Sequence, residues 1–304
     1  MIPAIINLPD PNDALPALTS YDWIVVNTSA GKDSQAMLDY VVRLARAAGV
    51  LDRVVAVHAD LGRVEWEGTR ELAERQAKHY GVRFEVVKRE QNDLLDHVRE
   101  RGMWPSSAAR YCTSDHKRGP VRTLFTRLVS EWRRLEAEAA GTYIDGITPL
   151  PRAGRPCRLL NCMGMRAEES PVRAKLPVFR ASSPATGGNG LRVVDVWHPI
   201  HGWTTEQVWS AIRASGVPHH RAYDLGMKRL SCVFCIFAPE SALMIAGQHN
   251  RSLLREYVKV EDETGHAFRG TAKKKFHLRV IQERLDRGER VEAANVDDDG
   301  CWGM

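Results

Sequence analysis

The sequence of 304 residues contains no long hydrophobic run and no internal repeat, and it has little excess charge. A membrane-spanning helix needs about 18–20 consecutive apolar residues, so we expect neither an integral membrane protein nor a membrane partner. Residues 1–20 lack a basic leader and contain several prolines and acids, so no signal peptide is predicted and a cytoplasmic location is the expectation. The formal net charge of +5 permits a polyanionic partner without requiring one.

Cysteine is also scarce, with six residues in the whole chain. In a chain without an export signal, so few cysteines favour metal or redox chemistry over structural disulfides. The remaining composition, 43% hydrophobic and 27% charged, is typical of a globular protein that buries a large core.

Short β-branched runs alternate with helical patterns in the first half of the chain. The runs at 22–27, 53–60 and 83–88 precede expected helices at 33–48, 65–80 and 92–102. Further strands are expected at 158–165 and 191–200, and further helices at 119–139 and 204–216, the last with Thr204 as its N-cap. This alternation predicts an α/β fold with a mostly parallel sheet and helices on both faces.

The expected domain organisation has three parts. An N-terminal extension covers 1–20, a nucleotide-binding domain covers 21–225, and a C-terminal segment covers 226–304. The middle part contains an irregular insertion at 141–157 and a loop at 182–190 whose composition predicts mobility. The last part contains a cysteine pair, mostly helical sequence from about 239 to 288, and an acidic tail.

The stretch VVNTSAGKDSQAML, residues 25–38, passes from a predicted strand into a predicted helix through small residues. Such a junction exposes backbone N–H groups at the positive end of the helix dipole, which favours a phosphate group. It is not the common P-loop, because Val26 and Asp33 stand where that motif has glycine and Ser or Thr. The predicted phosphate site comprises Ser29, Ala30, Gly31, Lys32, Asp33 and Ser34.

This loop, SAGKDS, resembles the SGGKDS-type loop of the PP-loop ATP pyrophosphatases. Three later segments are similar to the phosphoadenosine phosphosulfate (PAPS) reductase family: HADLG at 58–62, GMRAEESPVRAKLPV at 164–178 and HPIHGWTTEQVW at 198–209. The resemblance extends over about residues 22–225. It implies a Rossmann-like adenine-nucleotide alpha-hydrolase fold, with a helical C-terminal segment added.

The same resemblance implies that the chain binds ATP with Mg²⁺ and that Lys32, Asp33 and Arg166 are catalytic. It implies further nucleotide contacts by Asp60, Gly62, Gly164, Arg166, Ser170 and Arg173. The residue types agree, because the arginine fork suits phosphate oxygens and a carboxylate after a strand can hold a ribose hydroxyl or Mg²⁺. A helix cap or a solvated charge is the alternative for Asp60.

The segment SCVFCIF at 231–237 places Cys232 and Cys235 on one short turn, which suits a metal ion or cluster. RYCTSDHKRGP resembles the Cys-x-x-x-x-Lys region of iron–sulfur members of the family, which implies Cys112 as a third ligand. A [4Fe–4S] cluster is expected and zinc is the alternative. The fourth ligand is open between Cys301, Cys162 and Cys157, or one iron stays without a cysteine. Lys117 and Arg118, which follow Cys112, either hold phosphate or are solvated.

Two enzymatic functions and one non-enzymatic function remain open. In the first, ATP is cleaved between its α and β phosphates, an acceptor is adenylated, and sulfur displaces AMP, as in DNA phosphorothioation or RNA thiolation. The partners would then be a nucleic-acid acceptor and a sulfur donor such as a cysteine desulfurase, with a homodimer as one option. In the second, a sulfonucleotide is reduced and sulfite released, with Cys301 as a nucleophile. The third is a non-catalytic, zinc-containing nucleic-acid-binding module.

Overall fold

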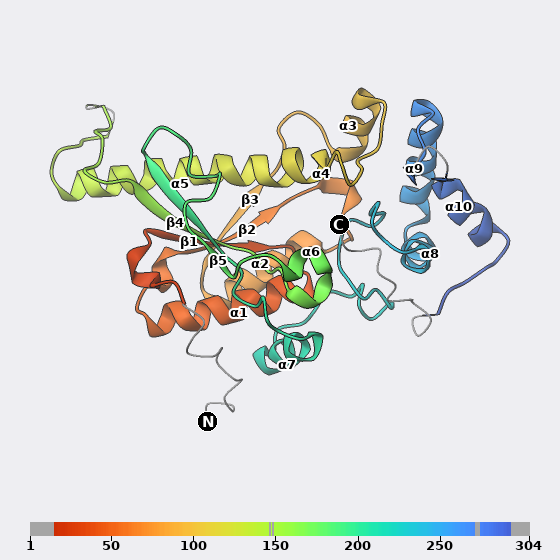
Figure 1. Cartoon of the computed structure of the whole chain (residues 1–304), viewed down its shortest axis with the longest axis horizontal. Helices are drawn as coiled ribbons and strands as arrows, with labels where there is room; N and C mark the ends of the chain where they lie inside the picture. The colour runs from red at the N-terminus through yellow and green to blue at the C-terminus, as the bar shows by residue number, and fades with distance from the viewer. Residues whose placement is uncertain (1–14, 146, 148, 271–273, 293–304) are drawn as a thin grey trace.

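The computed structural model describes residues 15–145, 147, 149–270 and 274–292, and its main feature is a six-stranded sheet (Figure 1). The strands follow the order β3-β2-β1-β4-β6-β5, and all pairs are parallel except β5 with β6. Their bounds are β1 Trp23–Thr28, β2 Val54–Ala59, β3 Arg83–Val87, β4 Cys157–Cys162, β5 Phe179–Arg180 and β6 Arg192–Trp197. The α/β fold with a mostly parallel sheet is therefore confirmed.

Helices cover both faces of this sheet. The longer ones are α1 Lys32–Ala47, α2 Thr69–Tyr80, α3 Leu94–Arg101, α5 Gly119–Ala139, α7 Thr205–Ser215, α8 Glu240–His249, α9 Arg251–Thr264 and α10 Leu278–Asp286. Figure 1 shows α5 along one face and α1 with α7 across the other. On the α5 face, Leu124, Phe125 and Leu128 are buried against the strands. On the opposite face, Met37 and Val41 of α1 pack in one cluster with Ile212 of α7.

The C-terminal helices form a third cluster with α3, on the right of Figure 1. Trp104 stacks on Tyr257 of α9, with ring centroids 5.2 Å apart, and the edge of Phe268 packs against both rings. Leu61 and Trp66, which follow β2, belong to the same cluster. A small antiparallel pair, β7 Arg269–Gly270 and β8 Lys275–Phe276, lies between α9 and α10 in the chain. The C-terminal segment thus shares its core with the first half of the chain.

Several boundaries differ from the sequence-based expectations. The helix expected from residue 65 begins at Thr69, because Gly62–Val64 forms a 3-10 turn and Gly68 has a φ of +83°. Short elements were not predicted: strand β5, helix α4 Tyr111–Thr113, helix α6 Pro171–Ala174, and a π-helical turn, Ser114–Arg118, that leads into α5. Three further 3-10 turns cover Leu18–Ser20, Leu51–Arg53 and Ala167–Glu169.

Among the described residues, no helix combines the length and the apolar character needed to cross a bilayer. The extension at 1–14 and the tail at 293–304 lie outside the described residues. Residues 182–190, expected to form a loop, contain no helix or strand.

Candidate functional site: the β1–α1 loop and its cavity

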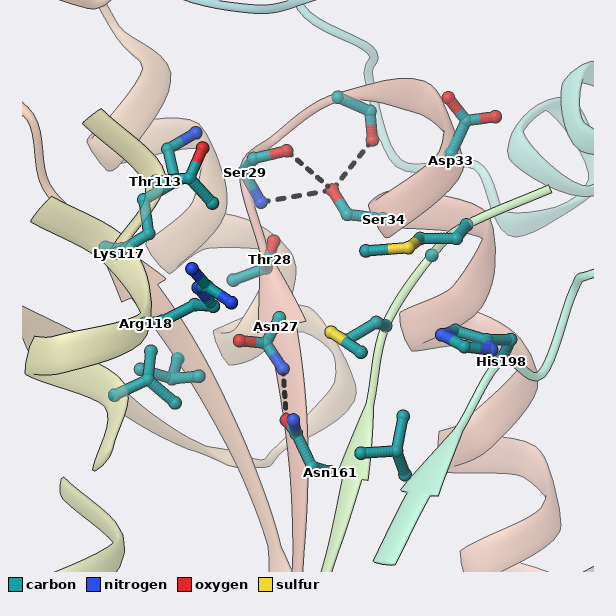
Figure 2. A pocket seen from close by; sticks show the side chains of 18 of the residues that line it. Asn27, Thr28, Ser29, Asp33, Ser34, Thr113, Lys117, Arg118, Asn161 and His198 are labelled. Atoms are coloured by element: carbon teal, nitrogen blue, oxygen red, sulfur yellow. Dashed lines mark hydrogen bonds between the residues drawn. The ribbon is translucent and has the colours of Figure 1, made fainter. Parts of the chain in front are cut away.

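The loop between β1 and α1 is shaped by an unusual backbone turn and by a serine in the helix. Ala30 is fully buried with a φ of +55°, a left-handed conformation that non-glycine residues rarely adopt. Ser34 Oγ accepts a hydrogen bond from Ser29 N at 3.1 Å and donates one to Gly31 O at 2.9 Å (Figure 2). The Ser29 hydroxyl lies 3.4 Å from Ser34 Oγ. The loop is thereby held as a tight bend at the carboxyl edge of the sheet.

The two predicted phosphate-binding cations, Lys32 and Arg166, are both engaged by Asp33. Lys32 Nζ lies 2.9 Å from Asp33 Oδ2, and Arg166 Nε lies 2.6 Å from Asp33 Oδ1. Arg166 also contacts Glu168 and donates to Trp203 O at 3.0 Å, so this side chain, 2% exposed, has most of its donors satisfied. Burial alone would raise the pKa of Asp33, but the charges of Lys32 and Arg166 outweigh it and keep that pKa below its ordinary value.

Gly164 permits the segment after β4 to pass directly over the start of α1. A Cβ at this position would lie 3.2 Å from the carbonyl carbon and oxygen of Asp33 and 3.3 Å from Ser34 N. These are backbone atoms of the first turn of α1, which cannot rotate away. The glycine is therefore required for this close approach of two backbone segments, a packing role that the sequence analysis did not predict.

Tyr223 covers the N-terminus of α1 from the other side. Its hydroxyl accepts a hydrogen bond from Lys32 N at 2.8 Å. A Cβ on Gly31 would lie 3.5 Å from both this hydroxyl and Leu230 Cβ. One of the N–H groups that a phosphate would use is thus already paired with a side chain of the chain itself.

The loop forms one wall of a cavity of about 580 Å³. Of the predicted site residues, those that line it are Ser29, Gly31, Asp33, Ser34, Gly164 and Arg173, whereas Ala30, Lys32, Asp60, Gly62, Arg166 and Ser170 do not. Asp60 Oδ1 accepts from Gly62 N at 2.7 Å, and Ser170 caps α6 by accepting from Arg173 N at 3.2 Å. Phosphate contact by these residues stays a prediction.

The opposite wall carries cations that the sequence analysis either left open or missed. These are Lys117, Arg118, Arg122, Arg180 and Arg229. Glu169 forms ion pairs with both Arg173 and Arg229. The distance from Arg229 Nη2 to Glu169 Oε1 is 3.2 Å. In the chain as far as it is described, Lys117, Arg118, Arg122 and Arg180 form no ion pair with an acidic side chain.

Sequence signals for this second wall are weak. Lys117 and Arg118 follow a cysteine, but nothing in their spacing indicates the π-helical turn that places them at the cavity. Such turns occur often at functional sites. Arg122 and Arg180 have no local signal, because they come from α5 and from the unpredicted edge strand β5.

The cysteines fall into two groups. Cys112, Cys232 and Cys235 are partly buried against the cluster that surrounds Tyr257. Burial raises the pKa of Cys112 and raises that of Cys232 to about 12, and the nearby charge of Lys117 offsets part of both shifts. Lys117 also lines the cavity, so it links the cavity to these thiols.

Cys162, which the sequence analysis left open as a fourth ligand, belongs to the other group. It is fully buried at the end of β4, inside the cluster formed with α1 and α7, and burial is the only cause of its raised pKa. Cys157, at the start of β4, is also fully buried, in the cluster beneath α5. Cys301 lies outside the described residues.

Comparison with known proteins gives matches over most of the chain. The family model described as a phosphoadenosine phosphosulfate reductase domain matches residues 23–238. Adenosine 5'-phosphosulfate reductase of Allochromatium vinosum is 27% identical over 216 residues, which cover 70% of this chain and 68% of that protein. An uncharacterized 37.8 kDa protein of Escherichia phage 186 is 29% identical over 170 residues, 56% of this chain and 42% of that protein.

The chain therefore spans less than half the length of the phage relative. Among solved structures, a phosphoadenylyl-sulfate reductase from Candida auris in a phosphate complex has a TM-score of 0.44 and 16% identity. That match covers 71% of this chain and 84% of the other.

Proposed function

The chain belongs to the phosphoadenosine phosphosulfate reductase family, and from this premise we propose that it binds ATP in the cavity and activates an acceptor for sulfur transfer. The acceptor oxygen attacks the α-phosphate, the bond between the α and β phosphates breaks, and pyrophosphate leaves. A sulfur nucleophile then attacks the adenylated carbon or phosphorus centre of the acceptor and displaces AMP. A nucleic acid as acceptor and a cysteine desulfurase as sulfur donor remain part of this proposal.

The observation that carries the proposal is the pairing of a phosphate loop with a cationic wall across one cavity. Ser29 and Ser34 line it on the loop side, and Lys117 and Arg118 line it on the other. ATP bound with Mg²⁺ retains negative charge on its phosphates, and unpaired cations opposite a helix N-terminus attract such a group. Asp33 and Glu168 together offset the charges of Lys32 and Arg166, so the charge available to ATP comes mainly from the second wall.

A [4Fe–4S] cluster at Cys112, Cys232 and Cys235 is the cofactor that we propose. Among the described residues only His58, Asp60 and Glu65 bring three ligand atoms within 4.8 Å of one another, so at least one pair of the three cysteine sulfurs is farther apart than 4.8 Å. A tetrahedral zinc ion with Zn–S bonds of about 2.3 Å needs sulfurs about 3.8 Å apart. A cubane binds each thiolate at a different iron and fits the wider spacing better. When bound, it supplies an iron for Cys301 or for the transferred sulfur.

Sulfonucleotide reduction is the second candidate, because the relative from Allochromatium vinosum is named as an adenosine 5'-phosphosulfate reductase and aligns with 70% of this chain. In that reaction a thiolate attacks the sulfate sulfur and the nucleotide leaves. A dithiol reductant such as thioredoxin then releases sulfite and becomes the disulfide. The proposed nucleophile would be Cys301, which lies outside the described residues.

One experiment separates these functions. Anaerobically purified protein is incubated with ATP and Mg²⁺, with and without bulk tRNA or DNA, and pyrophosphate and AMP are measured. A parallel reaction contains adenylyl sulfate or PAPS with thioredoxin, and sulfite is measured. Pyrophosphate release that requires a nucleic acid supports sulfur transfer, whereas sulfite formation supports the reductase. Zinc content with neither activity would support the nucleic-acid-binding module instead.

Variants connect the activity to the cationic wall. Arg118→Ala is expected to weaken ATP binding about 10-fold or more, because a charge-assisted hydrogen bond is worth about 1.5–3 kcal/mol. Arg152→Ala is the matched control, since Arg152 is exposed and does not line the cavity. Equal ATP affinity of the two variants would contradict the assignment of this wall.

A further inference from the structure

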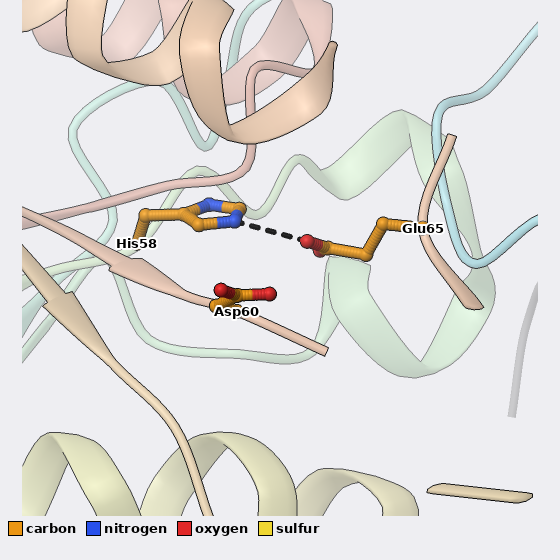
Figure 3. Close-up of side chains that lie close together, drawn as sticks. All are labelled: His58, Asp60 and Glu65. Atoms are coloured by element: carbon orange, nitrogen blue, oxygen red, sulfur yellow. Dashed lines mark hydrogen bonds and ion pairs between the residues drawn. The ribbon is translucent and has the colours of Figure 1, made fainter. Parts of the chain in front are cut away.

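We propose that His58, Asp60 and Glu65 form a binding site for a divalent transition-metal ion at the edge of the cavity. Their ligand atoms all lie within 4.8 Å of one another, and Figure 3 shows the three side chains converging. The donors of this site are an imidazole and two carboxylates and include no cysteine thiol. It does not rest on the proposed function, because ion binding is measurable without any nucleotide.

The hydrogen bonds of His58 prepare one ring nitrogen for a metal ion. His58 Nδ1 lies 3.1 Å from Thr28 O, a carbonyl that can only accept, so the Nδ1 proton is directed at it. His58 Nε2 faces the Glu65 carboxylate at 3.0 Å. Metal-binding histidines commonly donate one ring N–H to a backbone carbonyl and bind the ion through the other nitrogen. His58 is 1% exposed, so its orientation is fixed by the surrounding core.

The two carboxylates complete a donor set of one nitrogen and two or more oxygens. Asp60 Oδ1 is held by Gly62 N at 2.7 Å, and Asp60 Oδ2 lies 3.7 Å from the half-exposed Arg70 guanidinium, which can move into solvent. Within the described part of the chain, the Glu65 side chain makes no hydrogen bond besides that to His58. Imidazole with carboxylates favours Mn²⁺, Fe²⁺ or Zn²⁺, whereas Mg²⁺ and Ca²⁺ prefer oxygen ligands alone.

The fold places this site beside the phosphate loop. Thr28 and His58 are paired in the parallel register of β1 and β2, and Ser29 follows Thr28 directly. Glu65 lines the same cavity as Ser29 and Ser34. The open coordination positions of a bound ion would therefore face the cavity, where water or an anionic ligand oxygen can occupy them.

Binding of Mn²⁺ alone tests the proposal. The hard ion Mn²⁺ prefers oxygen and nitrogen donors to thiolates, so the cysteines do not compete for it. Loss of the free-ion EPR signal during titration of the full chain should show one bound Mn²⁺ that equimolar Mg²⁺ does not displace. Glu65→Gln and Asp60→Asn should each weaken this binding about 10-fold or more. Glu67→Gln is the matched control, because the Glu67 side chain is 86% exposed and is absent from the cluster.

Thermal unfolding of each variant establishes that it is folded. His58→Gln is the third variant. If it fails to fold, the test depends on Asp60→Asn and Glu65→Gln alone. Mn²⁺ affinity that is unchanged in both carboxylate variants, or wild-type protein that binds no Mn²⁺, overturns the proposal. The His58–Glu65 contact would then be a structural ion pair. Neither outcome affects the ATP and sulfite assays described above, so the two proposals fail separately.

Discussion

Replacing Gly164 by alanine tests whether the close contact between the β4 exit and α1 controls the phosphate loop. The added Cβ would lie 3.2 Å from the backbone of Asp33, whereas ordinary van der Waals contacts begin at 3.4 Å. Because the opposing atoms are backbone, the β4 exit or the first turn of α1 must move by a few tenths of an ångström. Overpacking of this kind costs about 1–3 kcal/mol.

The free energy of unfolding, measured in urea, should therefore fall by that amount in Gly164→Ala. The shift also moves Ser34 N relative to Ser29, so ATP affinity measured by equilibrium dialysis should fall as well. Gly154→Ala is the control, because a Cβ there meets no atom within 4 Å and its φ is not in the left-handed region. The free energy of unfolding of this control should be unchanged or higher by up to about 1 kcal/mol. Wild-type stability and ATP affinity in Gly164→Ala would refute the reasoning.

Three further changes probe the same region. Asp33→Asn should lower the free energy of unfolding by about 3 kcal/mol at pH 7, because it leaves Lys32 and Arg166 without their shared carboxylate. Since the pKa of Asp33 is lowered in the folded protein, the wild type should lose its extra stability over Asp33→Asn as pH falls below about 4. Urea unfolding of both proteins at pH 7 and at a pH below about 4 checks this expectation. Tyr223→Phe removes the hydroxyl that accepts from Lys32 N, so the free energy of unfolding should fall by about 1 kcal/mol. The freed N–H should also tighten the binding of inorganic phosphate, measured by calorimetry. Unchanged phosphate affinity would contradict the role of the hydroxyl as a competitor. Cys112→Ser should abolish the visible absorbance of anaerobically reconstituted protein, and retention of a full cluster spectrum would exclude Cys112 as a ligand.

Much of the fold follows from local sequence patterns. The helix expected at 119–139 coincides with α5, and the predicted Thr204 cap of α7 accepts from Gln207 N at 3.2 Å while the Gln207 side chain reciprocates. Buried parallel strands are recognisable because both their faces are apolar. Strand β5 has only two residues and pairs antiparallel with β6, so it has too few positions for a detectable pattern.

The site was less predictable than the fold, because its residues come from segments far apart in the sequence. The bend at Ser29–Ser34 was recognisable from one contiguous stretch, and the structure holds it by contacts within that stretch. By contrast, the hydrogen bond from Lys32 N to Tyr223 joins residues 191 positions apart, and the cation at Arg180 reaches the cavity from an edge strand. No local pattern specifies such long-range placement.

Lys32 and Arg166 show why residue type alone is insufficient at this site. A cation next to a glycine-containing turn suggests a phosphate contact, but the adjacent Asp33 binds both cations and cancels much of their charge. A ligand carrying several negative charges must then be neutralised elsewhere, and Lys117 and Arg118 supply unpaired positive charge, within the described chain, on the facing wall. Since the charge of Lys117 also offsets part of the rise that burial causes in the pKa of Cys112 and Cys232, binding of a polyphosphate there would change the electrostatic potential at the thiols. Lys117 therefore connects the cavity wall electrostatically to Cys112 and Cys232.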